Sequence, residues 1–121
     1  MFDHVAIRTR DLDKSVKFYE KALAPLGFKK SVSFDGGTGF GKHESPSFWI
    51  VRMEETPTTA AHFAFSCSSR PEVERFYREA MSAGGQDNGP PEIQEEYGPT
   101  YFAAFVLDPN GNNVEAVFHE S

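Results

Sequence analysis

Hydrophobic and polar residues alternate along residues 2–9, FDHVAIRT, a pattern that predicts a β-strand. A helix follows, because Asp11 can cap it and apolar residues then recur at helical spacing until Pro25 and Gly27. The face of this helix comprises Leu12, Val16, Tyr19 and Leu23, with Phe18 and Ala22 beside them. Further strands are predicted over residues 28–34 and 47–53, followed by a polar linker over 54–60.

The same order of elements returns in the second half. A strand is predicted over 62–67, and Ser69 and Glu72 have the spacing of a capping box. The helix face that follows comprises Val73, Phe76, Tyr77 and Ala80, and the helix ends at Gly84 and Gly85. Residues 85–100 are predicted mainly as loop, with a short edge strand near Gln86. Strands over 100–107 and 113–119 are joined by a turn, Asp108-Pro109-Asn110-Gly111.

An internal repeat connects the two halves. Residues 4–27 lie over residues 62–85 without a gap, with identical residues at six positions: His4/His62, Ala6/Ala64, Phe18/Phe76, Tyr19/Tyr77, Ala22/Ala80 and Gly27/Gly85. The last strands of the two halves also match at a larger offset, which places Trp49 over Glu115. We therefore predict one α+β domain built from two βαβββ modules, residues 1–57 and 58–121.

Composition narrows the class of protein. The chain has 121 residues, 39% of them hydrophobic, and a formal net charge of −6 without a cluster of Lys or Arg. Such a chain is a poor candidate for binding nucleic acid or anionic membranes, and no apolar run approaches a membrane span. Cys67 stands alone, so an internal disulfide is excluded, and the charged N-terminus is unlike a signal peptide. We expect a cytoplasmic protein that acts on a small molecule.

The repeat brings candidate metal ligands to equivalent positions. His4 and His62 would point into one cleft if the pseudo-twofold axis passes between the first strands of the modules. Glu115 would join them if Val114, Ala116 and Phe118 face the helices, since side chains alternate along a strand. Two histidines and a carboxylate suit a divalent metal with open coordination positions. The alternatives are ordinary hydrogen-bonded histidines and a salt bridge of Glu115 at the rim.

These residues resemble the vicinal oxygen chelate superfamily, which includes glyoxalase I, bleomycin resistance proteins and extradiol dioxygenases. The resemblance rests on DHVAIRTRDLDKSVKFYEKAL, HFAF and DPNGNNVE, and it covers nearly the whole chain. It implies an open, U-shaped mixed-sheet barrel around a metal held by His4, His62 and Glu115. The metal would be Zn, Ni, Fe, Mn or Co. Modules would pair either within one chain or across a homodimer.

One position departs from the family pattern. Glyoxalase I-like members carry a fourth ligand, usually Glu, on the last strand of the first module, and Trp49 stands there in this chain. That carboxylate takes part in proton transfer in glyoxalase I, so lactoylglutathione chemistry is placed in doubt. A set of two histidines and one Glu resembles the extradiol dioxygenases, although these are usually longer.

Three functions follow from the residues and the resemblance. The first is a metal-dependent lyase or isomerase in which the metal polarises two neighbouring oxygens of the substrate. Its general base would be Glu115, acting also as ligand, or His43. The second is an Fe(II) extradiol-type dioxygenase, with Tyr101 as a candidate acid or base. The third is a ligand-sequestering protein without turnover, like the bleomycin resistance proteins.

Three residues are predicted to bind substrate. Arg8 shares a strand face with His4 and suits an anionic group, and the spacing resembles that of a substrate-binding arginine in glyoxalase I. Trp49 is predicted to line the cavity and Tyr101 to stand beside it. The alternatives are a structural salt bridge for Arg8 and core packing for the two aromatic residues. Cys67 is interpreted as a packed residue, and His119 as lying too far along its strand to share the metal.

Overall fold

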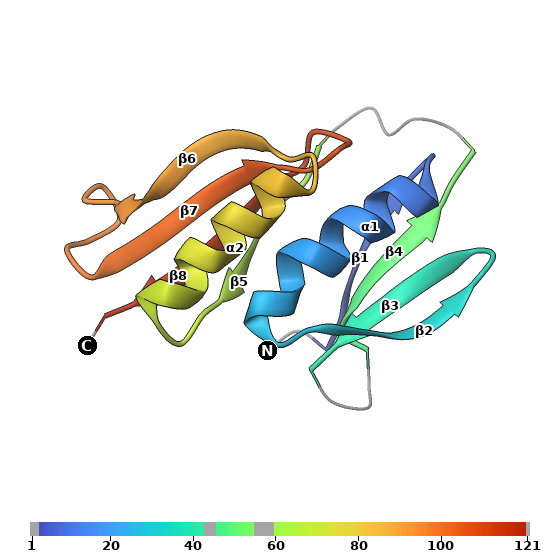
Figure 1. Ribbon diagram of the computed structural model, residues 1–121, viewed down its shortest axis with the longest axis horizontal. Coiled ribbons are helices and arrows are strands. Elements are labelled where there is room, and N and C mark those ends of the chain that lie inside the picture. The colour runs from blue at the N-terminus through green and yellow to red at the C-terminus, as the bar shows by residue number, and fades with distance from the viewer. Residues whose placement is uncertain (1–2, 43–45, 55–59, 121) are drawn as a thin grey trace.

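The computed structural model describes residues 3–42, 46–54 and 60–120. Each half of the chain has one helix and four strands in the predicted βαβββ order (Figure 1). The first half contains β1 (Val5–Thr9), α1 (Leu12–Leu23), a short 3₁₀ helix (Ala24–Leu26), β2 (Lys29–Phe34), β3 (Gly37–Gly41) and β4 (Phe48–Arg52). The second contains β5 (His62–Ser66), α2 (Arg70–Ser82), β6 (Gln86–Ile93), β7 (Tyr101–Leu107) and β8 (Asn113–His119). The predicted module boundary after residue 57 lies outside the described residues.

The strands form two four-stranded mixed sheets. Sheet A has the order β1-β4-β3-β2 and sheet B the order β5-β8-β7-β6. In each sheet the first strand of the module pairs in parallel with the last, and the other pairs are antiparallel. The two sheets share no strand pairing among the described ranges, so the α+β architecture of two modules is confirmed without a closed barrel.

Both helices begin where the sequence predicts. The Asp11 side chain accepts a hydrogen bond of 3.1 Å from the Lys14 backbone N–H at the start of α1. The Ser69 hydroxyl accepts one of 3.3 Å from the Glu72 N–H at the start of α2. These bonds satisfy N–H groups that have no partner within the helix.

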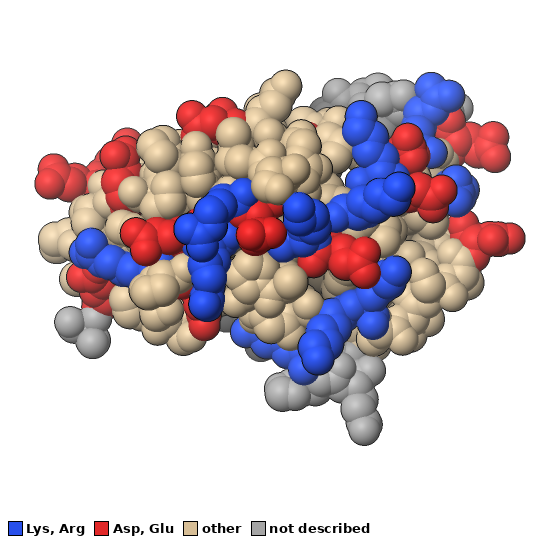
Figure 2. All heavy atoms as spheres, viewed as in Figure 1, with Lys and Arg blue, Asp and Glu red and all other residues tan. Residues whose placement is uncertain are grey.

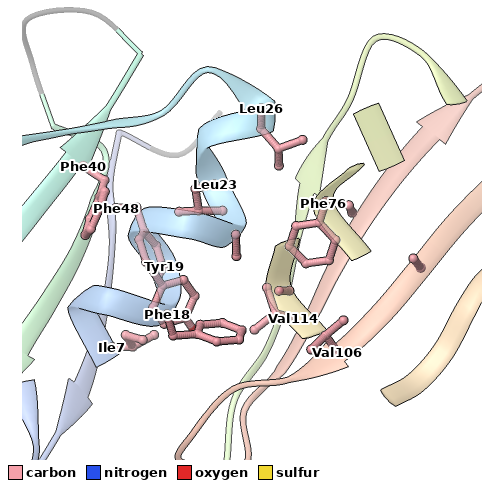
Figure 3. Packing of buried hydrophobic residues seen from close by; sticks show 14 of the residues in the cluster. Ile7, Phe18, Tyr19, Leu23, Leu26, Phe40, Phe48, Phe76, Val106 and Val114 are labelled. Atoms are coloured by element: carbon pink, nitrogen blue, oxygen red, sulfur yellow. The ribbon is translucent and has the colours of Figure 1, made fainter. Parts of the chain in front are cut away.

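One hydrophobic cluster runs through both modules. The two helices lie side by side, each over one face of its own sheet (Figure 1). Phe18 of α1 extends toward Val106 and Val114 of sheet B, so the first module's helix helps to cover the second module's sheet (Figure 3). Gly85 permits this approach, because a Cβ there would lie 2.4 Å from Val106 Cγ1 and 2.9 Å from the Phe18 ring.

The segment predicted mainly as loop is instead a long strand. β6 covers eight residues, Gln86–Ile93, at the edge of sheet B. Pro90 and Pro91 argue against a central strand because they cannot donate to a neighbour, but an edge strand tolerates them. Register shifts on both sides of Gly89 relieve the remaining mismatch with β7. The expectation of a short edge strand near Gln86 therefore needs correction.

The turn between β7 and β8 fastens the two modules together. Asp108, which is buried, accepts a hydrogen bond of 2.5 Å from the Tyr19 hydroxyl of α1. The Asn110 amide donates to the Thr9 hydroxyl at 2.8 Å. Burial and the Asp108 carboxylate raise the pKa of the Tyr19 hydroxyl well above its usual value. The turn predicted from the sequence therefore also holds the modules in place.

Charges of both signs are interspersed over the helical face (Figure 2). The groove between α1 and α2 illustrates this mixture, being lined by Glu20, Lys21, Arg75 and Glu79 together with apolar Ala24 and Pro25. In the described ranges, no helix combines the length and apolarity needed to cross a bilayer.

Candidate metal centre

The face of sheet B that turns away from α2 carries the candidate site. β5 and β8 run in parallel, with His62 paired to Asn113 and Ala64 to Glu115. Val114 and Ala116 are buried in the core, so Glu115 between them points to the opposite face. The pattern of β8 predicted this orientation.

His62 and Glu115 meet on this face. His62 Nε2 lies 3.2 Å from Glu115 Oε1. The Glu115 side chain is only 3% exposed, whereas that of His62 is 53% exposed. A buried carboxylate is costly unless it has partners, and here an imidazole at the solvent boundary provides one.

Tyr101 binds the other oxygen of the same carboxylate. Its hydroxyl donates a hydrogen bond to Glu115 Oε2. Burial raises the pKa of this hydroxyl, and the adjacent Glu115 carboxylate raises it further, so Tyr101 keeps its proton. The predicted substrate-binding residue thus contacts the predicted ligand directly, and both carboxylate oxygens have partners.

The remaining nitrogen of His62 is also occupied. The Asn113 side-chain amide lies 2.7 Å from His62 Nδ1. The imidazole ring stacks on Phe105 with a centroid separation of 6.4 Å. Contacts on three sides therefore fix the orientation of the ring and direct Nε2 toward Glu115.

His4 lies apart from this group. It precedes β1 in sheet A, is exposed, and its Nδ1 lies 2.8 Å from the Asp3 carboxylate. A crevice of about 210 Å³ separates it from β5 and is lined by Ala64 and Ser66 on the β5 side. No group of three His, Cys, Asp or Glu residues suited to a metal occurs within residues 3–42, 46–54 and 60–120. The structure brings together two of the three predicted ligands and leaves His4 in the other module.

Trp49 and Arg8 share the corresponding face of sheet A. Trp49 is paired with Ala6 and Arg8 with Val51 in the β1–β4 ladder. The indole lies over Gly39, where a Cβ would be 3.1 Å from the ring. Arg8 is exposed, and no carboxylate of the described residues forms an ion pair with it. The Trp49 ring is half-buried and contacts Phe34, which is exposed.

Three further residues from the sequence analysis are Cys67, His119 and His43. Cys67 is half-buried against the hydrophobic cluster, and burial raises the pKa of its thiol to about 12, which fits a packed and unreactive residue. His119 contacts the Tyr101 ring with a centroid separation of 5.0 Å rather than Glu115. His43 lies outside the described residues.

Two contacts of the site were not predicted, although the sequence contains part of the signal. The β7–β8 turn sets a register in which Tyr101 pairs with His119, and this places Tyr101 on the same face as Glu115. Asn113 follows the turn directly and is paired with His62 across β5 and β8. The first relationship can be read from the hairpin, whereas the second requires knowledge of which strands are neighbours.

The donors present fit a divalent metal. An imidazole nitrogen and a carboxylate oxygen on one rigid sheet face are ligands that Zn²⁺ and the other divalent transition metals accept. Each also has a second hydrogen-bonding partner, as metal ligands in proteins usually do. Two such donors are fewer than a metal site requires, so a further ligand, and water or substrate, would have to complete the coordination shell.

Two repeated βαβββ modules with imidazole and carboxylate groups on a strand face define a glyoxalase-like class of protein. The sequence profile of the Glyoxalase/Bleomycin resistance protein/Dioxygenase superfamily matches residues 1–116. The chain belongs to this superfamily.

Individual proteins with glyoxalase-type names are also similar to this chain over nearly its whole length. A lactoylglutathione lyase of Haemophilus influenzae is 27% identical, over 98% of this chain and 92% of that protein. The crystal structure of a glyoxalase/bleomycin resistance protein from Albidiferax ferrireducens T118 is 26% identical, with a TM-score of 0.83 over 98% of both chains. A lactoylglutathione lyase from Agrobacterium tumefaciens shares the fold, with a TM-score of 0.72, 18% identity and 98% and 92% of the two chains covered.

Proposed function

We propose that the protein is a metal-dependent lyase or isomerase that acts on a small substrate bound through two neighbouring oxygens. The observation that carries this proposal is the buried Glu115 carboxylate, whose Oε1 lies 3.2 Å from His62 Nε2 on the face of sheet B that turns away from α2. Membership of the glyoxalase superfamily and the similarity to a lactoylglutathione lyase support it.

His62 and Glu115 would hold the metal, and His4 would complete the ligand set. Because His4 lies in the other module, it would reach the metal either within one chain, across the crevice that it shares with β5, or from the second copy of a homodimer. When bound, the metal would polarise the substrate oxygens and make the neighbouring C–H group more acidic.

The protein's own residues would then move the proton. Glu115 is the base candidate, because no other carboxylate of the described residues contacts His62. Tyr101 keeps its proton and donates a hydrogen bond to Glu115 Oε2. Glu115 would therefore accept the substrate proton on its other oxygen, Oε1. Trp49 cannot accept a proton, so the first module offers no second base at its equivalent position.

The remaining two residues would bind the substrate. Arg8 would pair with an anionic group of the substrate, since its guanidinium forms no ion pair with the described carboxylates. Trp49 would cover the apolar part. Both lie on the face of sheet A that corresponds to the face carrying Glu115 in sheet B.

The test measures turnover with each divalent metal on hemithioacetals of methylglyoxal and on catechols, together with exchange of the substrate C–H proton in deuterated water. Glu115→Gln should abolish exchange while the fold is retained. Ring cleavage of catechols with Fe²⁺ would indicate the dioxygenase instead. Exchange that persists in Glu115→Gln would contradict the proposed base.

A second candidate is a ligand-sequestering protein without turnover. The aromatic character of both faces favours it, since Phe34 contacts Trp49 and Tyr97 contacts Tyr101. Tight ligand binding without exchange or product formation, with every metal tested, would support this alternative.

A further inference from the structure

We propose that Asn113 is a positioning residue that selects which ring nitrogen of His62 carries the proton, and thereby sets how readily His62 accepts a metal. The inference rests on the proposed function for its metal readout, but its geometric part concerns the metal-free protein alone.

Asn113 is held against His62 by the backbone. The two residues are directly paired in the parallel β5–β8 ladder, and the Asn113 Nδ2 atom lies 2.7 Å from His62 Nδ1. The other end of the amide is occupied, because Asn88 of β6 donates from its Nδ2 to Asn113 Oδ1 at 3.1 Å. Asn88, Asn113 and His62 thus form one hydrogen-bonded chain, which ends beside Glu115 because His62 Nε2 lies 3.2 Å from Glu115 Oε1.

The direction of this chain determines the tautomer. An amide nitrogen only donates, so His62 Nδ1 must accept and carries no proton. A neutral imidazole then has its proton on Nε2, the nitrogen that lies 3.2 Å from Glu115 Oε1. In this arrangement the nitrogen that faces Glu115 has no free lone pair for a metal.

Metal binding requires the opposite arrangement. His62 must carry its proton on Nδ1 so that the lone pair of Nε2 is free, and the proton lost from Nε2 is balanced by the one gained at Nδ1. Asn113 can accept from Nδ1–H if its amide turns to present Oδ1, and Asn88 must then accept from Asn113 Nδ2. By turning together, the amides of Asn88 and Asn113 can therefore hydrogen-bond to either tautomer of His62.

The first module uses a different partner for its histidine. His4 Nδ1 faces the Asp3 carboxylate, which only accepts and so favours a proton on Nδ1. Replacing Asn113 by Asp would give His62 the same kind of partner. This difference between equivalent histidines makes Asn113, rather than the ligand itself, the position at which the affinity of the site can be adjusted.

The experiment has a metal-free arm. Nitrogen-15 NMR of the full chain, at a pH where the imidazole is neutral, identifies the protonated nitrogen of His62. The wild type should show the proton on Nε2. Asn113→Asp should move it to Nδ1, and so should Asn88→Asp, because an acceptor at residue 88 forces Asn113 to turn. Ser66→Asp adds the same charge on the exposed end of β5 and should leave the tautomer unchanged.

The second arm is the affinity for Zn²⁺ or Ni²⁺ measured by calorimetry. Asn113→Asp should bind more tightly than the wild type, by about 10- to 100-fold, the usual size of effect for a residue that hydrogen-bonds to a metal ligand. A His62 tautomer that neither Asp substitution changes would overturn the inference. Absence of metal binding in every variant would instead overturn the proposed function, with the tautomer arm still deciding the role of Asn113.

Discussion

Trp49 occupies in the first module the position that Glu115 occupies in the second. Ala6 pairs with Trp49 across β1 and β4, and its repeat equivalent Ala64 pairs with Glu115 across β5 and β8. The fold is therefore duplicated, but its chemistry is not: a carboxylate faces outward from sheet B and an indole from sheet A. At this position one module therefore carries an acidic side chain and the other an aromatic one.

Restoring the symmetry gives the first prediction. Trp49→Glu places a carboxylate at the position equivalent to Glu115, and the half-buried environment of residue 49 allows it to stay ionised. We expect a fourth ligand to tighten metal binding, and turnover of hemithioacetals to rise because a second base becomes available. Trp49→Phe, which adds no ligand, is the matched control. Equal metal affinity in the two variants would mean that residue 49 lies outside the coordination shell.

Tyr101 gives the second prediction. Tyr101→Phe removes the hydroxyl that orients the Glu115 carboxylate and should weaken metal binding by about 10- to 100-fold, the usual range for such a partner. Tyr97→Phe is the control, because its ring lies beside Tyr101 but is 63% exposed. Titration with Zn²⁺ measures both variants, and parallel effects of the two substitutions would show that the hydroxyl of Tyr101 has no special role.

Arg8 gives the third prediction. Arg8→Ala should weaken anionic ligands by about 10- to 150-fold, the equivalent of about 1.5–3 kcal/mol for a hydrogen bond to a charged group. Arg8→Lys should restore part of this, since it keeps the charge but not the forked geometry. Metal content should stay at the wild-type level. Binding of neutral analogues serves as the internal control, and an equal loss for neutral and anionic ligands contradicts the assignment.

Two groups whose pKa is raised by burial, the Tyr19 hydroxyl and the Cys67 thiol, predict that the folded protein loses stability at alkaline pH. The pKa values of Tyr19 and Cys67 are raised in the folded protein, so each group is neutral there at pH values where it ionises in the unfolded chain. Their contribution to stability is complete at neutral pH and is lost as pH rises beyond about 9, where unfolded thiols and then phenols ionise. The free energy of unfolding in urea, followed against pH, should therefore fall in this range.

Two variants separate these groups. Cys67→Ala should remove the earlier part of the alkaline loss. Tyr19→Phe should reduce the later part, to which Tyr101 also contributes, and lower stability at neutral pH by about 1.5–3 kcal/mol, because buried Asp108 loses a donor. An alkaline profile that neither substitution alters would place the sensitive groups elsewhere.

The sequence predicted the modules because each of its local signals agreed with the repeat. The turn at Asp108 and the caps at Asp11 and Ser69 all lie where the structure has them. Strand β6 was missed because Pro90 and Pro91 argue against a strand, and only its edge position, which is a property of the assembled sheet, makes them acceptable.

The site was predicted in part for a similar reason. Alternation along β8 correctly assigned Glu115 to the face away from the core, and the repeat correctly matched it with Trp49. The hydrogen bonds from Tyr101 and Asn113 depend on which strands lie side by side and in what register, which a local pattern does not contain. The separation of His4 from His62 depends on how the modules pack, and symmetry of sequence alone could not settle it.

The metal content of the purified protein, measured by elemental analysis, tests the central claim most directly. The wild type should retain a divalent metal in an amount equimolar with the chain, and His62→Ala should lose it, since the remaining ligands cannot close the site. His119→Ala, which removes an imidazole from the same face of β8, should retain it. Full metal content in His62→Ala, or a wild type that takes up no divalent metal after reconstitution, would contradict the account.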